Sequence, residues 1–178
     1  AKAPIASNTH GGRAKCLQRL VRLDLPVPRT VALSFDAVQR IARGELPDIA
    51  AIVSQFPEGT LLCVRPSSED PDWGGPGAVL NIGMNATRFE TLTARLGADA
   101  ARAIDTRFVQ SYAVDVARLD PDVFEDVQGE SDDGLAEALR AYEAELEEPN
   151  PSDPTEQLAA VLKSNARDRA GTSARQQT

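Results

Sequence analysis

The sequence predicts a mixed α+β fold, with a small sheet in the first half of the chain and a largely helical second half. Two apolar runs of strand length, at 60–64 and 78–82, flank a segment rich in glycine and proline. From residue 85 onwards, apolar residues recur instead at helical spacing. A chain of 178 residues has room for one hydrophobic core, so we expect one domain over 1–163 and a flexible tail over 164–178.

The segment before the first predicted strand pair contains the patterns of three helices. Residues 14–23 predict an amphipathic helix, because four apolar side chains share one side of it: Leu17, Leu20, Val21 and Leu23. Two prolines then favour extended geometry, and 30–33 predicts a short strand. Ser34 is a plausible cap for a second helix that ends at Gly44, and 48–55 predicts a short third helix.

The two predicted strands enclose the longest loop of the chain. Residues 60–64 form a continuous apolar run, which is typical of a strand covered on both faces. Residues 66–77 contain the turn-forming residues of a loop, and loops of about a dozen residues in compact domains tend to be functional or disordered. Cys16 and Cys63 lie in a predicted helix and a predicted strand without metal-site spacing, and we interpret both as small buried apolar residues.

Helical periodicity dominates the second half of the chain. The helical patterns cover 87–97, 98–119, 134–148 and 153–170. Asp153 can cap the last of these helices, with Glu156 completing a capping box. Between Asp120 and Glu148 there are twelve acidic residues and one basic residue, Arg140. We interpret this stretch as a solvated outer face, with an acidic partner-binding surface as the alternative.

Charge and hydropathy exclude several classes of function. A formal net charge of -8 argues against binding to nucleic acid or anionic membranes. The sequence contains no apolar run approaching the ~20 residues that cross a bilayer and no secretory pattern at its start, so we expect a cytoplasmic protein. Since His10 is the single histidine, a Ser/His/Asp arrangement would have to use it, and none is visible.

Two arginines are candidates for contacts with phosphate. Arg13 follows two glycines at the start of the first predicted helix, where free amides and a cation could bind an anion, although such a pair can also be a plain turn into the helix. Arg65 ends the first predicted strand, and ligands of open α/β sheets gather at the carboxyl ends of strands. Its guanidinium could bind phosphate or pair with Glu69 or Asp70.

The glycines of the long loop are the third candidate. Gly74, Gly75 and Gly77 could expose backbone amides to a polyphosphate, while Pro76 removes one donor. The loop lacks the ending of a Walker P-loop and the spacing of a dinucleotide fold. Trp73 could stack on a base or cover the loop.

Taken together and in this order, these segments resemble the pyruvate phosphate dikinase family, which includes phosphoenolpyruvate synthase. The stretch GGRAKCLQRLVRLDLPVPRTVALSFDAV resembles the opening of the family's ATP-binding domain, and LLCVRPSSEDPDWGGPGAVLNIGMN resembles its arginine-ended strand, glycine-bearing loop and following strand. Two later segments, AARAIDTRFVQSYAVDVARLDPDVFED and DPTEQLAAVLKSNARDRA, are similar to helices of the same domain. The likeness spans nearly the whole chain.

The resemblance implies an ATP-binding chain. Its fold would be the first half of an ATP-grasp-type domain, and its cofactors would be ATP and Mg²⁺. Arg13 and Arg65 would contact the nucleotide phosphates, and the loop glycines Gly74, Gly75 and Gly77 would cover them. Arg13 stands where the family has lysine, and Pro66 where serine is usual.

The 178-residue sequence contains no counterpart of two parts of the family's proteins. One is the second half of the ATP-binding domain with its acidic metal ligands, and the other is the swivelling domain with its phosphocarrier histidine. The resemblance therefore predicts the ATP-binding portion of a phosphotransferase that needs the missing parts, with a second polypeptide or a homodimer completing it. The alternative is a stand-alone dikinase-like scaffold that binds a protein partner and has lost ATP chemistry.

Overall fold

The computed structural model describes residues 4–68, 77–127 and 133–175. The elements follow the chain in the order α1 (Ser7–Arg22), α2 (Phe35–Ala42), α3 (Ile49–Val53), β1 (Leu62–Val64), β2 (Val79–Ile82), α4 (Ala86–Leu96), α5 (Ala98–Tyr112), η1 (Ala113–Ala117), η2 (Pro121–Phe124), α6 (Gly134–Leu146) and α7 (Pro154–Arg175). The predicted α+β class, with a small sheet and a largely helical second half, is confirmed.

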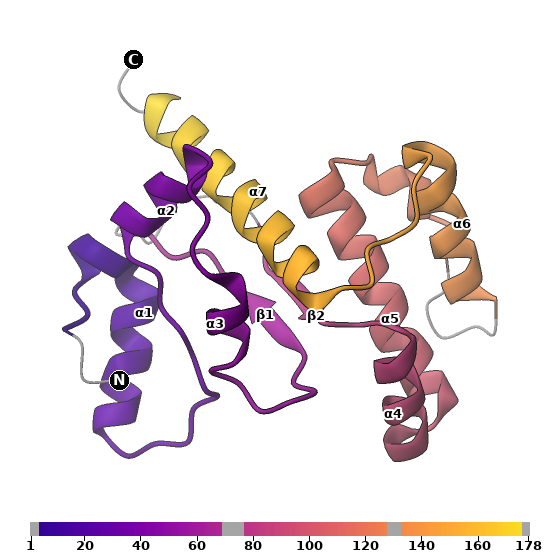
Figure 1. The fold of residues 1–178 in the computed structure, drawn as a ribbon, viewed down its shortest axis with the longest axis horizontal. Helices are drawn as coiled ribbons and strands as arrows, with labels where there is room; N and C mark the ends of the chain where they lie inside the picture. Colours follow the sequence, from indigo (N-terminus) through magenta and orange to yellow (C-terminus); the bar gives the residue numbers. More distant parts are fainter. Residues whose placement is uncertain (1–3, 69–76, 128–132, 176–178) are drawn as a thin grey trace.

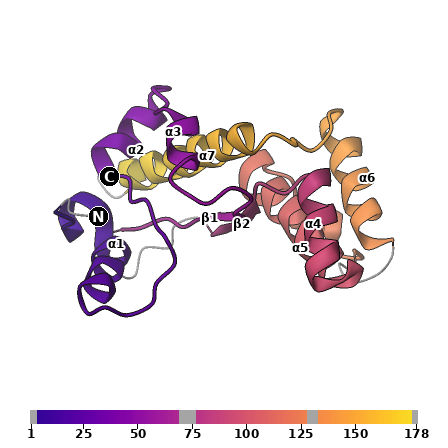
Figure 2. The ribbon, with the colours of Figure 1, turned by 60° about the horizontal axis from the view of Figure 1, so that its bottom comes forward.

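Helix α7 is the central element of the arrangement (Figure 1). It runs between a first group formed by α1, α2 and α3 and a second group formed by α4, α5 and α6, and the two strands lie between these groups (Figures 1 and 2). The last helix of the chain therefore lies beside α2 and α3, although about a hundred residues separate them in the sequence. This arrangement brings α7 close to the segment that follows β1.

The sheet consists of β1 and β2, which pair antiparallel with Leu62 opposite Ile82 and Val64 opposite Val79. We predicted that the first strand would be covered on both faces. This prediction was wrong, because Leu62 and Val64 of β1 are half-buried while Cys63 between them is exposed. The prediction that Cys16 and Cys63 are buried was wrong as well, since both cysteines are exposed. The predicted strand at 30–33 was wrong, because these residues have no regular secondary structure and the described residues form no ladder with them.

The hydrophobic core lies where β2, α5, α6 and α7 meet. Val79 and Ile82 of β2, Phe108 of α5 and Val161 of α7 are all at most 1% exposed. Tyr112 joins Phe108 to Tyr142 of α6 through tilted ring contacts with centroid distances of 5.6 and 6.5 Å. Burial of these aliphatic and aromatic side chains is the main source of stability for the α5–α7 half of the molecule.

A buried side chain fixes α7 against the end of β2. Gln157 is 0% exposed, and its Oε1 accepts a hydrogen bond from the Gly83 amide at 2.7 Å. Its Nε2 donates to the carbonyls of Met84 at 2.8 Å and Pro151 at 2.6 Å. One glutamine thus satisfies three backbone groups from two distant segments, so the polar contact specifies how α7 is placed on the sheet.

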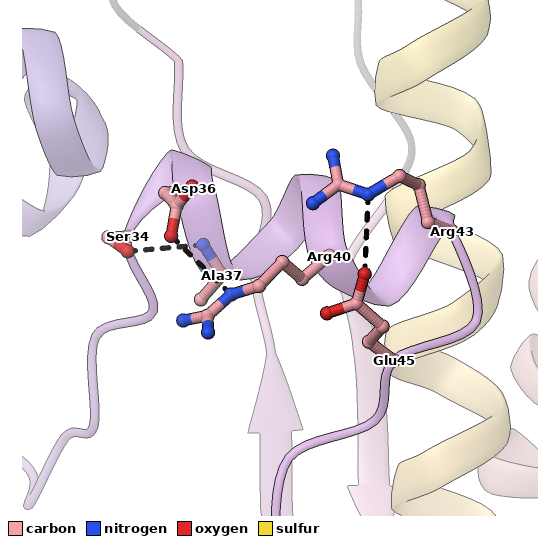
Figure 3. A network of polar contacts seen from close by, with 6 residues as sticks. All are labelled: Ser34, Asp36, Ala37, Arg40, Arg43 and Glu45. Atoms are coloured by element: carbon pink, nitrogen blue, oxygen red, sulfur yellow. Dashed lines mark hydrogen bonds and ion pairs between the residues drawn. The ribbon is translucent and has the colours of Figure 1, made fainter.

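The helix caps follow the sequence closely. Ser34 Oγ accepts a hydrogen bond from the Ala37 amide at 3.2 Å, as predicted for the start of α2 (Figure 3). The same close-up shows the Asp36–Arg40 and Arg43–Glu45 ion pairs, each at 3.4 Å. Both pairs are exposed, so we assign them little of the stability.

Helix α7 begins where the sequence predicts and extends further than expected. Asp153 accepts hydrogen bonds from the amides of Thr155 and Glu156, which confirms it as the cap of α7. We expected a flexible tail from residue 164, whereas α7 continues to Arg175. Among the described residues, no helix combines the length and apolar character needed to cross a membrane.

Candidate functional site

Two of the three segments singled out by the sequence meet in space. Arg13 donates from Nη1 to the carbonyl of Pro66, and the Gly12 amide donates to the carbonyl of Ser68 at 2.8 Å. The start of α1 thus packs directly on the chain that leaves β1. We call this place the junction, and define it by 11–13 of α1, 65–68 after β1, and Arg169 of α7.

The close approach at the junction depends on Gly11. This residue lies inside α1 with φ 84° and ψ 164°, a combination that only glycine adopts readily, and it kinks the helix there. A Cβ at this position would stand 2.8 Å from both the Ser67 carbonyl carbon and the Ser68 amide nitrogen. The glycine pair therefore serves contact between two chain segments, and the Gly12 amide is occupied by the protein itself.

Helix α7 contributes a cation that the sequence did not indicate. Arg169 donates from Nη1 to the carbonyl of Ser67 at 2.7 Å, and its guanidinium lies 3.7 Å from the centre of the Phe35 ring. The aromatic face of α2 and the carbonyl after β1 thus hold this guanidinium in place.

The far end of the glycine loop lies beside a polar network between η1 and α7. An added Cβ at Gly77 would be 3.5 Å from a carboxylate oxygen of Asp115. Arg118 donates to Ser164 at 2.8 Å and to Asp168 at 2.7 Å, and Ser164 donates to the Asp115 carbonyl at 2.9 Å. The pKa of Asp115 is raised above its usual value, mainly by burial. Arg118 opposes this shift, and Asp168 adds to it.

One hydroxyl of the junction has no partner. Ser67 Oγ is buried, and among the described residues nothing forms a hydrogen bond with it. A buried hydroxyl without a partner costs about 1–3 kcal/mol. The junction therefore has unused hydrogen-bonding capacity next to two guanidinium groups.

The remaining predicted site residues lie as follows. Arg65 is exposed, and no ion pair or hydrogen bond joins its side chain to the described part of the chain. Gly77 is exposed, whereas Gly74, Gly75 and Trp73 lie outside the described residues, as do Glu69 and Asp70. The sheet is antiparallel, so the rule on carboxyl ends of parallel strands does not apply to Arg65. Its candidacy rests instead on its place directly before Pro66.

The fold and site thus define an α+β protein in which arginines of α1 and α7 contact the backbone segment that begins with Arg65. The sequence matches no known protein family, and no curated protein matches it significantly. Membership of the pyruvate phosphate dikinase family therefore stays a prediction from the residues.

Outside the junction, the most perturbed carboxyl group with a defined value is that of Asp105 in α5. Burial raises the pKa of Asp105 from 3.8 to about 6, and no charged neighbour contributes to the shift. The sequence held a signal for this residue, because Asp105 lies four residues from buried Ala101 and four from buried Val109, on the same side of the helix.

The raised pKa predicts a pH-dependent effect of Asp105→Asn. An acid whose pKa is higher in the folded state destabilises the fold as pH rises through the interval from about 4 to 6. The free energy of unfolding of the variant, relative to the unchanged protein, should therefore rise by about 2–3 kcal/mol between pH 4 and pH 8. Urea unfolding at the two pH values measures this difference. A constant difference would show that Asp105 titrates normally.

Proposed function

We propose that this chain is the ATP-binding portion of a pyruvate phosphate dikinase-like phosphotransferase, and that the junction binds the phosphates of ATP. The observation that supports this function is that Arg13 of α1 and Arg169 of α7 both donate to backbone carbonyls of the segment 65–68, which begins with Arg65. These three arginines are far apart in the sequence. Arginine is the side chain best suited to bidentate contacts with phosphate oxygens.

Each group of the junction has a distinct part in this proposal. Arg65 makes no hydrogen bond or ion pair within the described residues, and in this proposal it binds the phosphates directly. Arg169 is positioned by Ser67 and Phe35 and adds a second positive charge beside the segment. Arg13 supports the segment through the Pro66 carbonyl, and the Ser67 hydroxyl, which has no partner among the described residues, can donate to a phosphate oxygen. Gly74, Gly75 and Gly77 would cover the nucleotide.

Mg²⁺ enters this proposal bound to the phosphates of ATP. Within the described ranges, no three His, Cys, Asp or Glu side chains are grouped to hold a metal ion. Asp115 lies beside Gly77 at the end of the loop, and both Asp115 and Asp168 lie near Arg118. Phosphoryl transfer needs metal-held phosphates as well as positioned cations, so we expect binding by this chain without transfer.

Calorimetric titration with ATP and Mg²⁺ tests the proposal. We expect a dissociation constant in the range of about 10 μM to 1 mM, and weakening by roughly tenfold or more in Arg65→Ala, since a hydrogen bond to a charged group contributes about 1.5–3 kcal/mol. Arg95→Ala is the matched control, because it removes the same charge from an exposed position of α4. Equal affinities of the two variants, or no heat at millimolar ATP, would refute phosphate binding at the junction.

A second candidate function is a scaffold that binds a protein partner. It is favoured by the end of α1 and the chain after it, where Val21, Leu23 and Leu25 are 50, 60 and 48% exposed. Leu20, Val21 and Leu23, which the sequence placed on the apolar side of this helix, are all exposed. Exposed apolar patches are typical of surfaces that bind another protein.

Sedimentation velocity separates the second candidate from the first. If this surface binds a second copy of the chain, Leu23→Ser should abolish a concentration-dependent dimer and leave ATP titration unchanged. If the chain is a monomer at all concentrations tested, this surface does not form a homodimer. Arg65→Ala should leave any such association intact.

A further inference from the structure

A cavity between α4, α5 and α6 lies away from the junction. It has a volume of about 360 Å³, which is within the usual range for small-molecule sites. Its walls are largely apolar and are formed by Met84, Phe89, Val109, Leu135 and Leu139. The Asn85 side chain donates to the Ser152 carbonyl at 3.3 Å, which joins two segments of the rim.

Two side chains in this cavity lack a partner. Asp105 lines it, and no hydrogen bond or ion pair reaches its carboxylate from any described residue. Asn150 also lines it, and its Nδ2 is buried without an acceptor in the described part of the chain. An unpaired carboxylate and an unpaired amide N–H are therefore both left for a ligand.

The charges around the cavity have one sign. Of the residues that line it, the ionisable ones are Asp105 of α5 and Glu90 of α4. The turn at 84–86, helix α6 and the segment 150–152 contribute apolar or neutral polar side chains to the lining. A cationic group is thus complementary to the cavity, while a ligand with a carboxylate would be repelled by both acids.

We propose that this cavity binds a small apolar molecule that carries a protonated amine, with Asp105 as counter-ion and Asn150 as donor to a neutral carbonyl oxygen. The aliphatic body of the ligand packs on the leucine, valine and phenylalanine walls. The class of ligand is therefore an apolar amine with an adjacent amide or ester, such as a carboxyl-blocked amino acid. The free amino acid is excluded by its carboxylate.

Binding of leucinamide compared with 4-methylpentanamide tests the proposal directly. The two molecules differ only by the amino group, which is largely protonated below its usual pKa of about 7.7–8.0. At pH 7 we expect leucinamide to bind at least about tenfold more tightly, measured by calorimetry or by ligand-detected NMR, because it supplies the counter-ion of Asp105. Similar affinities of the two compounds would overturn the proposal, as would no binding of leucinamide.

The pH dependence provides a second readout that needs no variant. Between pH 7 and pH 5, protonation of a group whose pKa is about 6 should weaken leucinamide binding by about tenfold and leave 4-methylpentanamide unchanged. Asp105→Asn should remove both the preference for the amine and the pH effect. Glu137→Gln, an exposed acid of α6 outside the cavity lining, should change neither. A pH effect that survives in Asp105→Asn would contradict the assignment.

Discussion

Replacing Gln157 by leucine is expected to lower the free energy of unfolding by about 3–5 kcal/mol. The substitution keeps a side chain of similar size, but leaves the Gly83 amide and the carbonyls of Met84 and Pro151 without the partners they have now. Each buried backbone group without a partner costs about 1–3 kcal/mol, and the apolar gain of leucine offsets part of the sum. Urea unfolding followed by circular dichroism measures the change.

Gln39→Leu is the matched control for this prediction. Gln39 lies on the exposed side of α2, so the same chemical change there should alter the free energy of unfolding by no more than about 0.5 kcal/mol. If Gln157→Leu were as mild as the control, the contact between α7 and β2 would not be what positions the central helix.

Gly11→Ala is expected to be the most disruptive glycine-to-alanine change among the described residues, with a loss of about 2–4 kcal/mol in the free energy of unfolding. The backbone at φ 84° and ψ 164° strains any residue with a Cβ, and the added methyl would meet backbone atoms of Ser67 and Ser68 at 2.8 Å. Since backbone on both sides must move, we expect α1 to separate from the junction. Thermal unfolding and ATP titration should both respond.

Gly12→Ala is the neighbouring control. A Cβ at Gly12 would be 3.6 Å from the Ser68 carbonyl oxygen, which is ordinary contact, and this glycine does not have the positive φ of Gly11. We expect stability to stay the same or to rise by up to about 1 kcal/mol, because alanine favours helix more than glycine does. Equal losses at the two positions would contradict the kinked arrangement.

Local signals in the sequence were sufficient to find the helices, although the first was expected at 14–23 and α1 begins at Ser7. Ser34 and Asp153 were identified as caps from residue type and spacing, and both accept the expected backbone hydrogen bonds. Periodicity does not say what covers an apolar side, however. Leu23 lies on the predicted apolar side of the first helix, yet 60% of it is exposed, because α1 meets the rest of the chain near its start.

Two of the three arginines of the candidate site could likewise be predicted from the sequence. Arg13 and Arg65 were selected from their places at a helix start and a strand end, and the structure joins Arg13 to the residue after Arg65. Arg169 was missed because it lies at the end of the last predicted helix and inside the expected tail, where no motif indicated a binding residue. Its position is determined by contacts with Ser67 and Phe35, and no local pattern records contacts across such separations.

The central claim is that the junction binds the phosphates of ATP, and amide chemical shifts of the ¹⁵N-labelled chain during titration with ATP and Mg²⁺ test it most directly. The account predicts saturable shifts concentrated at 11–13, Arg65, Ser67, Ser68 and Arg169, which require roughly tenfold more ATP or beyond in Arg65→Ala and stay unchanged in Arg95→Ala. Shifts that are absent at millimolar ATP, or that lie elsewhere and leave these amides unchanged, would contradict it.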